Sequence, residues 1–327
     1  MRTRKKQAEI LKRGSIYLEK DFWLKMSDGQ DIYLHHWHDE EVEPKAIVQL
    51  SHGMIEHIQR YNEFAEFLVS NGIFVYGNDH RGHGQTGEKS GLFGHFADEN
   101  GFERVVEDLK EINEFIHQQH PKTPVYLMGH SMGSFLVRRF VQRFHNTVNG
   151  VILSGTGGDL GLLGKVGKSF AKYQISKLGN RAESLIMKKL TFGKYNKMFK
   201  DVQTPSDWLT SDREEVQKVI NDPHCNFIPT AGFYYDLLMG LETIHKNQEV
   251  NKIDKHLPFF IFSGEKDPVG NNTKGVLSVI KQYKKHGINN LEYTFYQKGR
   301  HEMLFEVNRD EVKEHIRQWL EKQMAEV

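Results

Sequence analysis

The sequence predicts an α/β fold with a mostly parallel sheet and helices on both of its faces. Short apolar runs of strand length alternate along the chain with amphipathic helical patterns, as they do where helices link parallel strands. The chain has 327 residues, of which 38% are hydrophobic, which is enough to bury a large core. One predicted strand also runs through a tight glycine-containing turn straight into a predicted helix.

Eight strands are predicted. The first two, 22–26 and 32–37, are joined by Ser27-Asp28-Gly29 and predict a hairpin. The remaining strands are the runs 46–50, 73–76, 125–128, 151–154, 259–262 and 291–296. Helical periodicity predicts helices at 61–69, 102–117, 135–144, 276–285 and 311–324. The expected sheet is therefore eight-stranded and mostly parallel.

About 100 residues separate the sixth and seventh predicted strands, from 156 to 256. Active sites in such folds lie beyond the carboxyl ends of the strands, so an insertion at this end of the sheet predicts a helical cap or lid. The expected core is then formed by residues 1–155 and 257–327.

The inserted segment starts glycine-rich and becomes basic and helical, as at Lys188-Lys189-Leu190. The early glycines predict a connection about which the cap hinges; they are Gly157, Gly158, Gly161, Gly164 and Gly167. Some of the many apolar residues of this segment must face the pocket, and such a lining suits an acyl chain better than a peptide or a sugar. Phe233 and Leu238 are the candidate substrate-binding residues.

The turn after the fifth predicted strand has the form G-x-S-x-G, from Gly129 to Gly133. A strand, this turn and a helix together are the context of a nucleophile elbow. Such a turn strains the backbone of Ser131 and presents its hydroxyl at the positive end of the helix. Ser131 is therefore the candidate nucleophile.

A serine hydroxyl needs a base and a carboxylate to become a nucleophile. His301 follows the last predicted strand and is the candidate base. Two acids, Glu265 and Asp267, follow the seventh predicted strand. Asp267 is preferred because Pro268 fixes the turn directly after it, whereas Glu265 lies nearer the strand end. The order serine, acid, histidine is the one expected downstream of such an elbow.

An oxyanion hole requires two backbone N–H groups that face the substrate carbonyl oxygen. Met132, directly after the nucleophile, supplies one of them. The loop after the third predicted strand supplies the other: Gly53 allows a tight turn, which leaves the N–H of Met54 as the donor. His52 is interpreted as a structural hydrogen-bonding residue.

Two further motifs carry a resemblance to a known family. They are His52-Gly53-Met54-Ile55-Glu56-His57 followed by Arg60-Tyr61, and Asn78-Asp79-His80-Arg81-Gly82-His83-Gly84-Gln85-Thr86. With the elbow, Asp267 and His301, the chain resembles the monoacylglycerol lipase and lysophospholipase branch of the α/β-hydrolases, also labelled serine-aminopeptidase-like, from about residue 22 to 320. The resemblance implies the α/β-hydrolase fold and hydrolysis of lipid-derived esters. Many relatives have a small residue in place of Met54, which alters the pocket shape but leaves the main-chain donor.

The predicted function is a serine esterase or lipase that cleaves a single-chain acyl ester, such as a monoacylglycerol or a lysophospholipid, through an acyl-enzyme and without a cofactor. One alternative is an aminopeptidase for small apolar N-terminal residues. It requires a cap carboxylate to hold the substrate amine, for which Asp236 and Glu242 are available. A non-catalytic binding protein with this fold is the other alternative, and the complete set of three catalytic residues disfavours it.

A formal net charge of +1 gives no sign of nucleic-acid binding. The single cysteine, Cys225, excludes an internal disulfide and fits a reducing compartment. The chain has no apolar run of signal-peptide or membrane-span length, so a cytoplasmic location is expected. A basic start is expected to be a solvated terminus that can also make transient contact with anionic lipid: Arg2, Arg4, Lys5, Lys6, Lys12 and Arg13. The sequence leaves the oligomeric state open.

Two histidine pairs invite a metal interpretation. A zinc site needs three or four ligands, whereas the glycines around His80 and His83 favour a tight loop beside the active site. His36 and His38 share one face of a predicted strand and are expected to be solvated. No metal is predicted at either pair.

Overall fold

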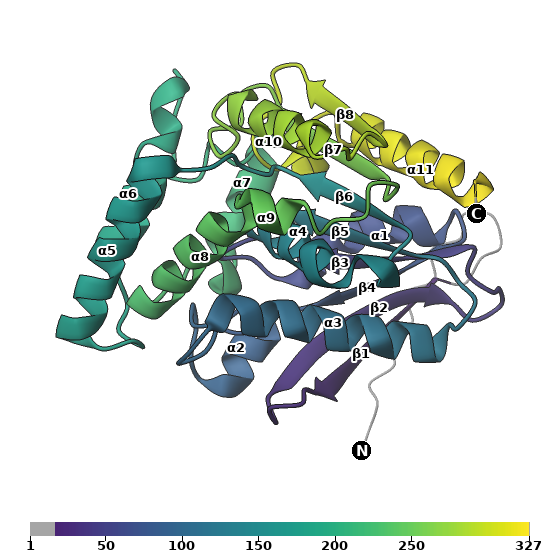
Figure 1. Ribbon diagram of the computed structural model, residues 1–327, viewed down its shortest axis with the longest axis horizontal. Coiled ribbons are helices and arrows are strands. Elements are labelled where there is room, and N and C mark those ends of the chain that lie inside the picture. Colours follow the sequence, from purple (N-terminus) through teal and green to yellow (C-terminus); the bar gives the residue numbers. More distant parts are fainter. Residues whose placement is uncertain (1–16, 327) are drawn as a thin grey trace.

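The computed structural model describes residues 17–326, and its centre is one eight-stranded sheet (Figure 1). The strand order is β1-β2-β4-β3-β5-β6-β7-β8. The strands are β1 (Tyr17–Lys25), β2 (Asp31–Asp39), β3 (Ala46–Ser51), β4 (Ile73–Asn78), β5 (Val125–His130), β6 (Gly150–Ser154), β7 (Phe259–Gly264) and β8 (Leu291–Tyr296). β1, β2 and β4 pair antiparallel, and all other pairs are parallel. The predicted sheet and its N-terminal hairpin are confirmed.

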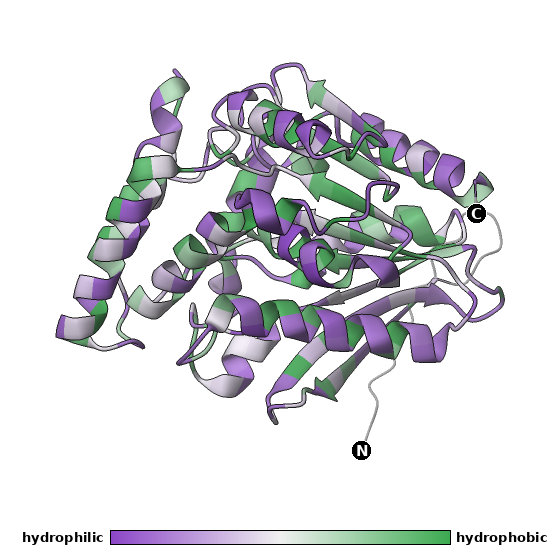
Figure 2. Ribbon diagram, viewed as in Figure 1, coloured by the Kyte–Doolittle hydropathy of each residue, from purple (hydrophilic) through white to green (hydrophobic). Residues whose placement is uncertain are grey.

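Helices cover both faces of the sheet, as predicted. Along β5, Leu127 packs into the cluster formed with α3 (Gly101–Gln119), α4 (Met132–Phe144) and α10 (Lys274–Lys285). Its neighbours Tyr126 and Met128 point the other way, into the cluster formed with α1 (Asn62–Val69) and α11 (Arg309–Ala325). The parallel strands inside the sheet, such as β6 and β7, are accordingly largely apolar (Figure 2), because parallel strands covered on both sides have no solvent face.

The first hairpin differs from prediction at two points. β1 begins at Tyr17 instead of residue 22, and Tyr17 pairs with Asp39. The residues of β1 before Phe22 are mostly polar, and the three next to it are exposed. They lack the apolar alternation that predicts a strand, and their backbone pairing with β2 forms the strand there. The expectation that the two histidines of β2 are solvated is wrong for His36, which is buried with its ring stacked 3.8 Å from that of Tyr76. β2 lies inside the sheet, where its neighbours cover this face.

Five helices occupy the long segment between β6 and β7: α5 (Gly161–Leu178), α6 (Leu185–Phe192), α7 (Arg213–Asn221), α8 (Ala231–Ile244) and α9 (Asn247–Val250). α8 packs on α3 and α4, and α5 packs on the outer side of α8 (Figure 1). Side chains of α8 join the main core cluster, whereas α5 buries only Ala171 and Gln174.

Only part of the glycine-rich start of this segment is helical, since Gly157 and Gly158 lie in the irregular connection before α5. Gly161, Gly164 and Gly167 all belong to α5. A Cβ atom on Gly167 would lie 3.3 Å from a methyl group of Leu238 on α8. The absence of a side chain at Gly167 therefore lets α5 approach α8 closely at this point.

None of the helices within residues 17–326 is long and apolar enough to cross a membrane. The basic residues proposed for lipid contact, from Arg2 to Arg13, lie outside the described residues.

Candidate active site

Ser131 occupies a strained turn between β5 and α4, with φ 50° and ψ −119°. Its N–H donates to the carbonyl oxygen of Ser154 at 2.9 Å. A Cβ atom on Gly133 would lie 2.0 Å from the carbonyl oxygen of Ser51, and one on Gly129 would lie 2.4 Å from that of Gly133. Glycine is required at both positions because α4 starts in contact with the end of β3. The turn holds Ser131 half-buried at the carboxyl end of the sheet.

His301 and Asp267 form a buried pair that follows β8 and β7. Nδ1 of His301 donates to Oδ1 of Asp267 at 2.9 Å. Asp267 is fully buried, and its carboxylate also accepts hydrogen bonds from the Val269 N–H at 2.8 Å and the Ser263 hydroxyl at 3.0 Å. The Glu265 side chain is exposed and takes no part in this pair.

The pKa of His301 is raised above its ordinary value of 6.5. Burial alone would lower it, but the negative charge of Asp267 and the hydrogen bond to it outweigh that effect. Asp267 also fixes the tautomer of the ring, so that Nε2 carries the lone pair and can accept a proton.

The buried His301–Asp267 pair lies against the nucleophile elbow at Ser131. The ring of His130, next to Ser131, is 4.8 Å from the ring of His301. A Cβ atom on Gly155, which follows β6, would lie 3.0 Å from Cε1 of His301. The fold therefore gathers Ser131, Asp267 and His301 at one end of the sheet.

The loop after β3 also lies against the elbow. A Cβ atom on Gly53 would lie 3.2 Å from the Cβ of Ser131. Among the hydrogen bonds of residues 17–326, the N–H groups of Met54 and Met132 have no protein acceptor. Met132 begins α4, where free N–H groups and the helix dipole favour negative charge. Both predicted donors are thus available beside Ser131.

A buried ion network supports this loop. The Gly53 N–H donates to Glu56, whose carboxylate also accepts from Arg60 at 2.7 Å. Arg60 also makes a bidentate contact with Glu302, at 2.8 and 2.7 Å, directly after His301. The network connects the loop that carries Met54 with the loop that carries the histidine. Glu56 and Arg60 belong to a family motif in the sequence, but the motif alone does not reveal that they connect these two loops.

An aromatic side chain between α6 and α7 covers His301. The ring of Trp208 lies 5.1 Å from that of His301, and Phe192 and Tyr195 surround Trp208 at 5.6 and 4.8 Å. Burial raises the pKa of the Tyr195 phenol to about 12, so the phenol stays neutral. This part of the chain was not singled out from the sequence, although its density of aromatic residues was a usable signal.

The Trp208 segment is fastened to the histidine loop by hydrogen bonds. The Glu302 N–H donates to the carbonyl oxygen of Leu209 at 2.7 Å, and the Thr210 hydroxyl donates to that of Phe305 at 2.9 Å. The position of Trp208 over His301 is thus fixed by main-chain contacts as well as by ring packing.

The two predicted substrate-binding residues lie on α8 in different surroundings. Phe233 is fully buried, with its ring 4.5 Å from that of Phe96 and 5.8 Å from that of His83. Leu238 lines a groove of about 340 Å³ between α5 and α8, together with Leu160. Phe233 thus lies in the packed interior, and Leu238 lies on a groove whose lining includes neither Ser131 nor His301.

The histidines near the elbow are used as hydrogen-bonding groups. His52 donates from Nδ1 to its neighbour Gly53 at 2.7 Å and accepts the His80 N–H at Nε2, at 3.0 Å. Nε2 of His80 contacts the Ser51 hydroxyl at 3.0 Å, and Nδ1 of His83 lies 2.9 Å from the carbonyl oxygen of Arg81. Burial lowers the pKa of all three rings, which keeps them neutral.

The chain is similar in sequence to several proteins that are named monoacylglycerol or monoglyceride lipases. A monoglyceride lipase of Mus musculus is 26% identical over 244 residues, which are 74% of this chain and 71% of that protein. A monoglyceride lipase homolog of monkeypox virus is 28% identical over 296 residues, which are 90% of this chain and 94% of that protein. The alignment with a monoacylglycerol lipase of Mycolicibacterium smegmatis, 35% identical over 115 residues, spans only 39% of that protein's length.

Solved structures show the same fold. A thermostable carboxyl esterase from Bacillus coagulans, in complex with glycerol, superposes with a TM-score of 0.87 at 27% identity, covering 94% of this chain and 99% of that chain. A monoglyceride lipase of Saccharomyces cerevisiae superposes with a TM-score of 0.70 at 19% identity, covering 92% and 94% of the two chains. Residues 42–308 match the family described as "Serine aminopeptidase, S33". Since this match covers most of the chain and the fold agrees, the chain belongs to that family of α/β-hydrolases.

Proposed function

We propose that the protein is a serine hydrolase that cleaves acyl esters through an acyl-enzyme. Ser131 attacks the ester carbonyl while Nε2 of His301 takes its proton, and Asp267 stabilises the imidazolium that forms. The N–H groups of Met54 and Met132 hold the negative charge on the carbonyl oxygen. His301 then protonates the leaving alcohol and activates water for deacylation. The observation that carries the proposal is the strained Ser131 beside the buried His301–Asp267 pair.

The proposed substrate is a single-chain ester, and a monoacylglycerol is preferred over a lysophospholipid because several relatives are named monoglyceride lipases. In this proposal residues 156–256 form a cap on a core made of 1–155 and 257–327. The apolar surroundings of His301, formed by Trp208 and its aromatic neighbours, support an acyl substrate.

Transient contact with a lipid surface is part of the same proposal. α5 and α6 expose an unusual number of large apolar side chains between their lysines: Leu162, Leu163, Val166, Tyr173, Leu178, Leu185, Ile186 and Leu190. Contiguous exposed apolar residues with interspersed basic charge favour binding at a membrane interface.

An aminopeptidase activity is less well supported. The Asp236 carboxylate is buried against the start of α3 at Gly101, and burial raises its pKa to about 7. Glu242 is paired with Lys168. Neither carboxylate is left free to hold the amine of a peptide substrate.

Acyl chain length is the test of this proposal. Each buried methylene contributes about 0.8 kcal/mol, which is up to about fourfold in kcat/KM per carbon when expressed in the transition state. p-Nitrophenyl esters of increasing length should be cleaved progressively faster until the pocket is filled, and aminoacyl-nitroanilides should be poor substrates. Monoacylglycerol and lysophospholipid of equal chain length, compared directly, identify the head group.

Leu238→Asp should flatten the chain-length profile while sparing acetyl ester, because a carboxylate in the groove between α5 and α8 would oppose a long acyl chain that extends into it. The equivalent change at Phe233 is a poor test, since a charge in the packed interior would unfold the protein. If acetyl esters are the best substrates and aminoacyl amides are cleaved equally fast, the lipid-ester proposal is wrong.

A further inference from the structure

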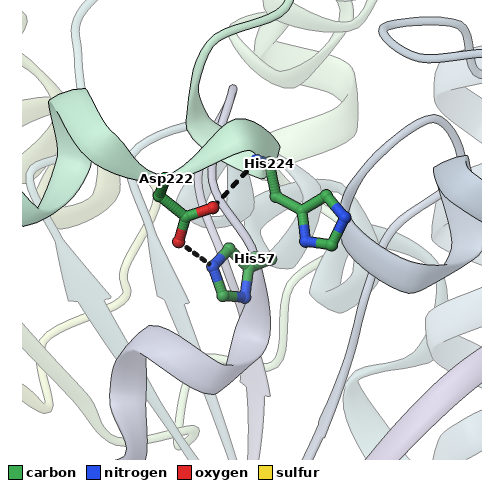
Figure 3. A group of neighbouring side chains, drawn as sticks. All are labelled: His57, Asp222 and His224. Atoms are coloured by element: carbon green, nitrogen blue, oxygen red, sulfur yellow. Dashed lines mark hydrogen bonds and ion pairs between the residues drawn. The ribbon is translucent and has the colours of Figure 1, made fainter.

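Three side chains with metal-binding atoms meet where the Met54 loop contacts the segment between β6 and β7. His57, Asp222 and His224 each offer one ligand atom, and these atoms all lie within 4.8 Å of one another. Figure 3 shows the three side chains directed toward one another, with His57 on the core side and the other two on the short turn after α7. None of the three takes part in the proposed ester hydrolysis.

The hydrogen bonds among His57, Asp222 and His224 hold their nitrogen and oxygen atoms close together, as metal binding requires. Nε2 of His57 lies 2.8 Å from Oδ2 of Asp222, a hydrogen-bond distance that a shared tetrahedral metal ion would widen by about 0.5 Å. The other oxygen of Asp222 accepts the His224 N–H at 2.8 Å, which fixes the carboxylate orientation. Ligand atoms of a tetrahedral zinc site lie about 3.3 Å apart, given metal–ligand distances of about 2.0–2.1 Å. A small rotation of the part-exposed His224 ring closes the remaining distance.

A carboxylate outside the group orients the His224 ring. Nε2 of His224 lies 3.1 Å from Oε2 of Glu88 on α2 (Gly84–Ser90). Nδ1 is then the nitrogen that remains for a metal, and in Figure 3 one ring nitrogen of His224 faces the other two side chains. Metal-bound histidines almost always donate their second N–H to a carboxylate or carbonyl in this way.

We propose that His57, Asp222 and His224 bind a divalent transition-metal ion, with Zn²⁺ as the best fit. Two imidazoles and one carboxylate are ligands that zinc prefers, whereas Mg²⁺ and Ca²⁺ favour oxygen-only sets. Water completes the coordination. The two neutral imidazoles and one carboxylate leave a bound Zn²⁺ with one positive charge, which the nearby Glu88 offsets.

The site is reachable from solvent and joins two parts of the fold. A groove of about 410 Å³ runs past His57 and Asp222, and Ser131 and His301 are not among its lining residues. The ion would tie the loop that carries Met54 to the turn after α7, and so hold the β6–β7 segment against the core. Its expected effect is to stabilise this closed arrangement.

Zinc titration of the EDTA-treated full-length protein tests the proposal. Calorimetry should show one Zn²⁺ bound per chain and no binding of Mg²⁺ at the same concentration. His224→Gln should weaken Zn²⁺ binding at least tenfold, and Glu88→Ala, which removes the acceptor for the His224 ring, should weaken it by roughly 10- to 100-fold. The unfolding midpoint should rise with Zn²⁺ in the wild type and not in His224→Gln.

Two variants control for other zinc ligands. His256→Gln removes an exposed histidine elsewhere on the chain and should bind Zn²⁺ as the wild type does. Cys225→Ser removes the nearby thiol, whose pKa is raised by burial, and should also bind normally. Absence of Zn²⁺ binding in the wild type, unchanged binding in His224→Gln, or loss of binding only in Cys225→Ser would each overturn the proposal.

Discussion

Asp267 is the only one of the two candidate acids whose surroundings suit a catalytic carboxylate. It is fully buried and accepts three hydrogen bonds, one of them from His301, while Glu265 on the same turn is exposed. In the sequence, Pro268 directly after Asp267 favours Asp267 over Glu265 as the triad carboxylate. The aromatic residues around Trp208 are a signal in the sequence, but the contact of Trp208 with His301 depends on how the chain folds back over the site and is given by no local motif.

The two acids are therefore expected to respond very differently to mutation. Asp267→Asn should lower kcat by about 10⁴, as in other serine triads, because the amide stabilises the wrong tautomer of His301. Glu265→Gln is the matched control and should stay close to wild type. Steady-state kinetics of both variants, with circular dichroism to check folding, provide the comparison. The reverse ranking would assign the role to Glu265.

The raised pKa of His301 has a pH signature. His301 acts as a base only when neutral, so kcat/KM should fall as the pH drops through its pKa, above 6.5. In Asp267→Asn the charge that raises the pKa is gone and burial, which lowers it, remains. The acidic limb of the residual activity should then shift to lower pH. If the acidic limb of the pH profile lay at the same pH in Asp267→Asn and in the wild type, Asp267 would not set the pKa of His301.

Among the elements, those with a strong local signal were predictable and those that depend on tertiary packing were not. The bounds of the buried strands from β3 to β7 and of the helices α1, α3, α10 and α11 agree with the predicted bounds to within two residues. β1 was predicted too short because its residues before Phe22 are held by backbone pairing with β2 and show no apolar periodicity. The glycines at the start of α5 concealed a helix, and one of them, Gly167, lies where α5 packs on Leu238 of α8.

The segment that carries Trp208 should control access to the site. Trp208→Ala removes the ring that covers His301, so kcat/KM for long-chain esters should fall roughly 10- to 100-fold, in line with the loss of one large apolar contact. Acetyl ester turnover should change less, and Trp208→Phe should retain most activity. Trp23→Ala, on the exposed face of β1, is the control. Equal losses for short and long esters would exclude a role in acyl binding.

At the scale of the whole molecule, the β6–β7 segment is unevenly connected to the core. Nine residues of α8 are buried, and several belong to the main core cluster with α3 and α4. α6 buries only Met187. The sequence predicted one insertion between the sixth and seventh strands, but it could not show that α8 of this segment packs into the main core cluster.

Hydrogen exchange should reveal this difference. Amides of α8 should be protected nearly as strongly as those of β5, because they open only with the core. Amides of α6 should exchange at least tenfold faster. Mass spectrometry of peptic fragments gives both rates in one experiment. Uniform exchange across α6 and α8 would show that the segment opens as a single unit.

The proposed mechanism depends above all on Ser131 as the nucleophile. A fluorophosphonate probe followed by peptide mass spectrometry tests it directly, because the probe phosphonylates only an activated serine. We predict a single adduct on Ser131, no adduct in Ser131→Ala, and retained labelling in Ser134→Ala, whose hydroxyl bonds to the Ser131 carbonyl oxygen one turn away. Ser131→Ala should also lose roughly 10⁴- to 10⁶-fold in kcat while remaining folded. An adduct on another serine, or full activity in Ser131→Ala, would contradict the account.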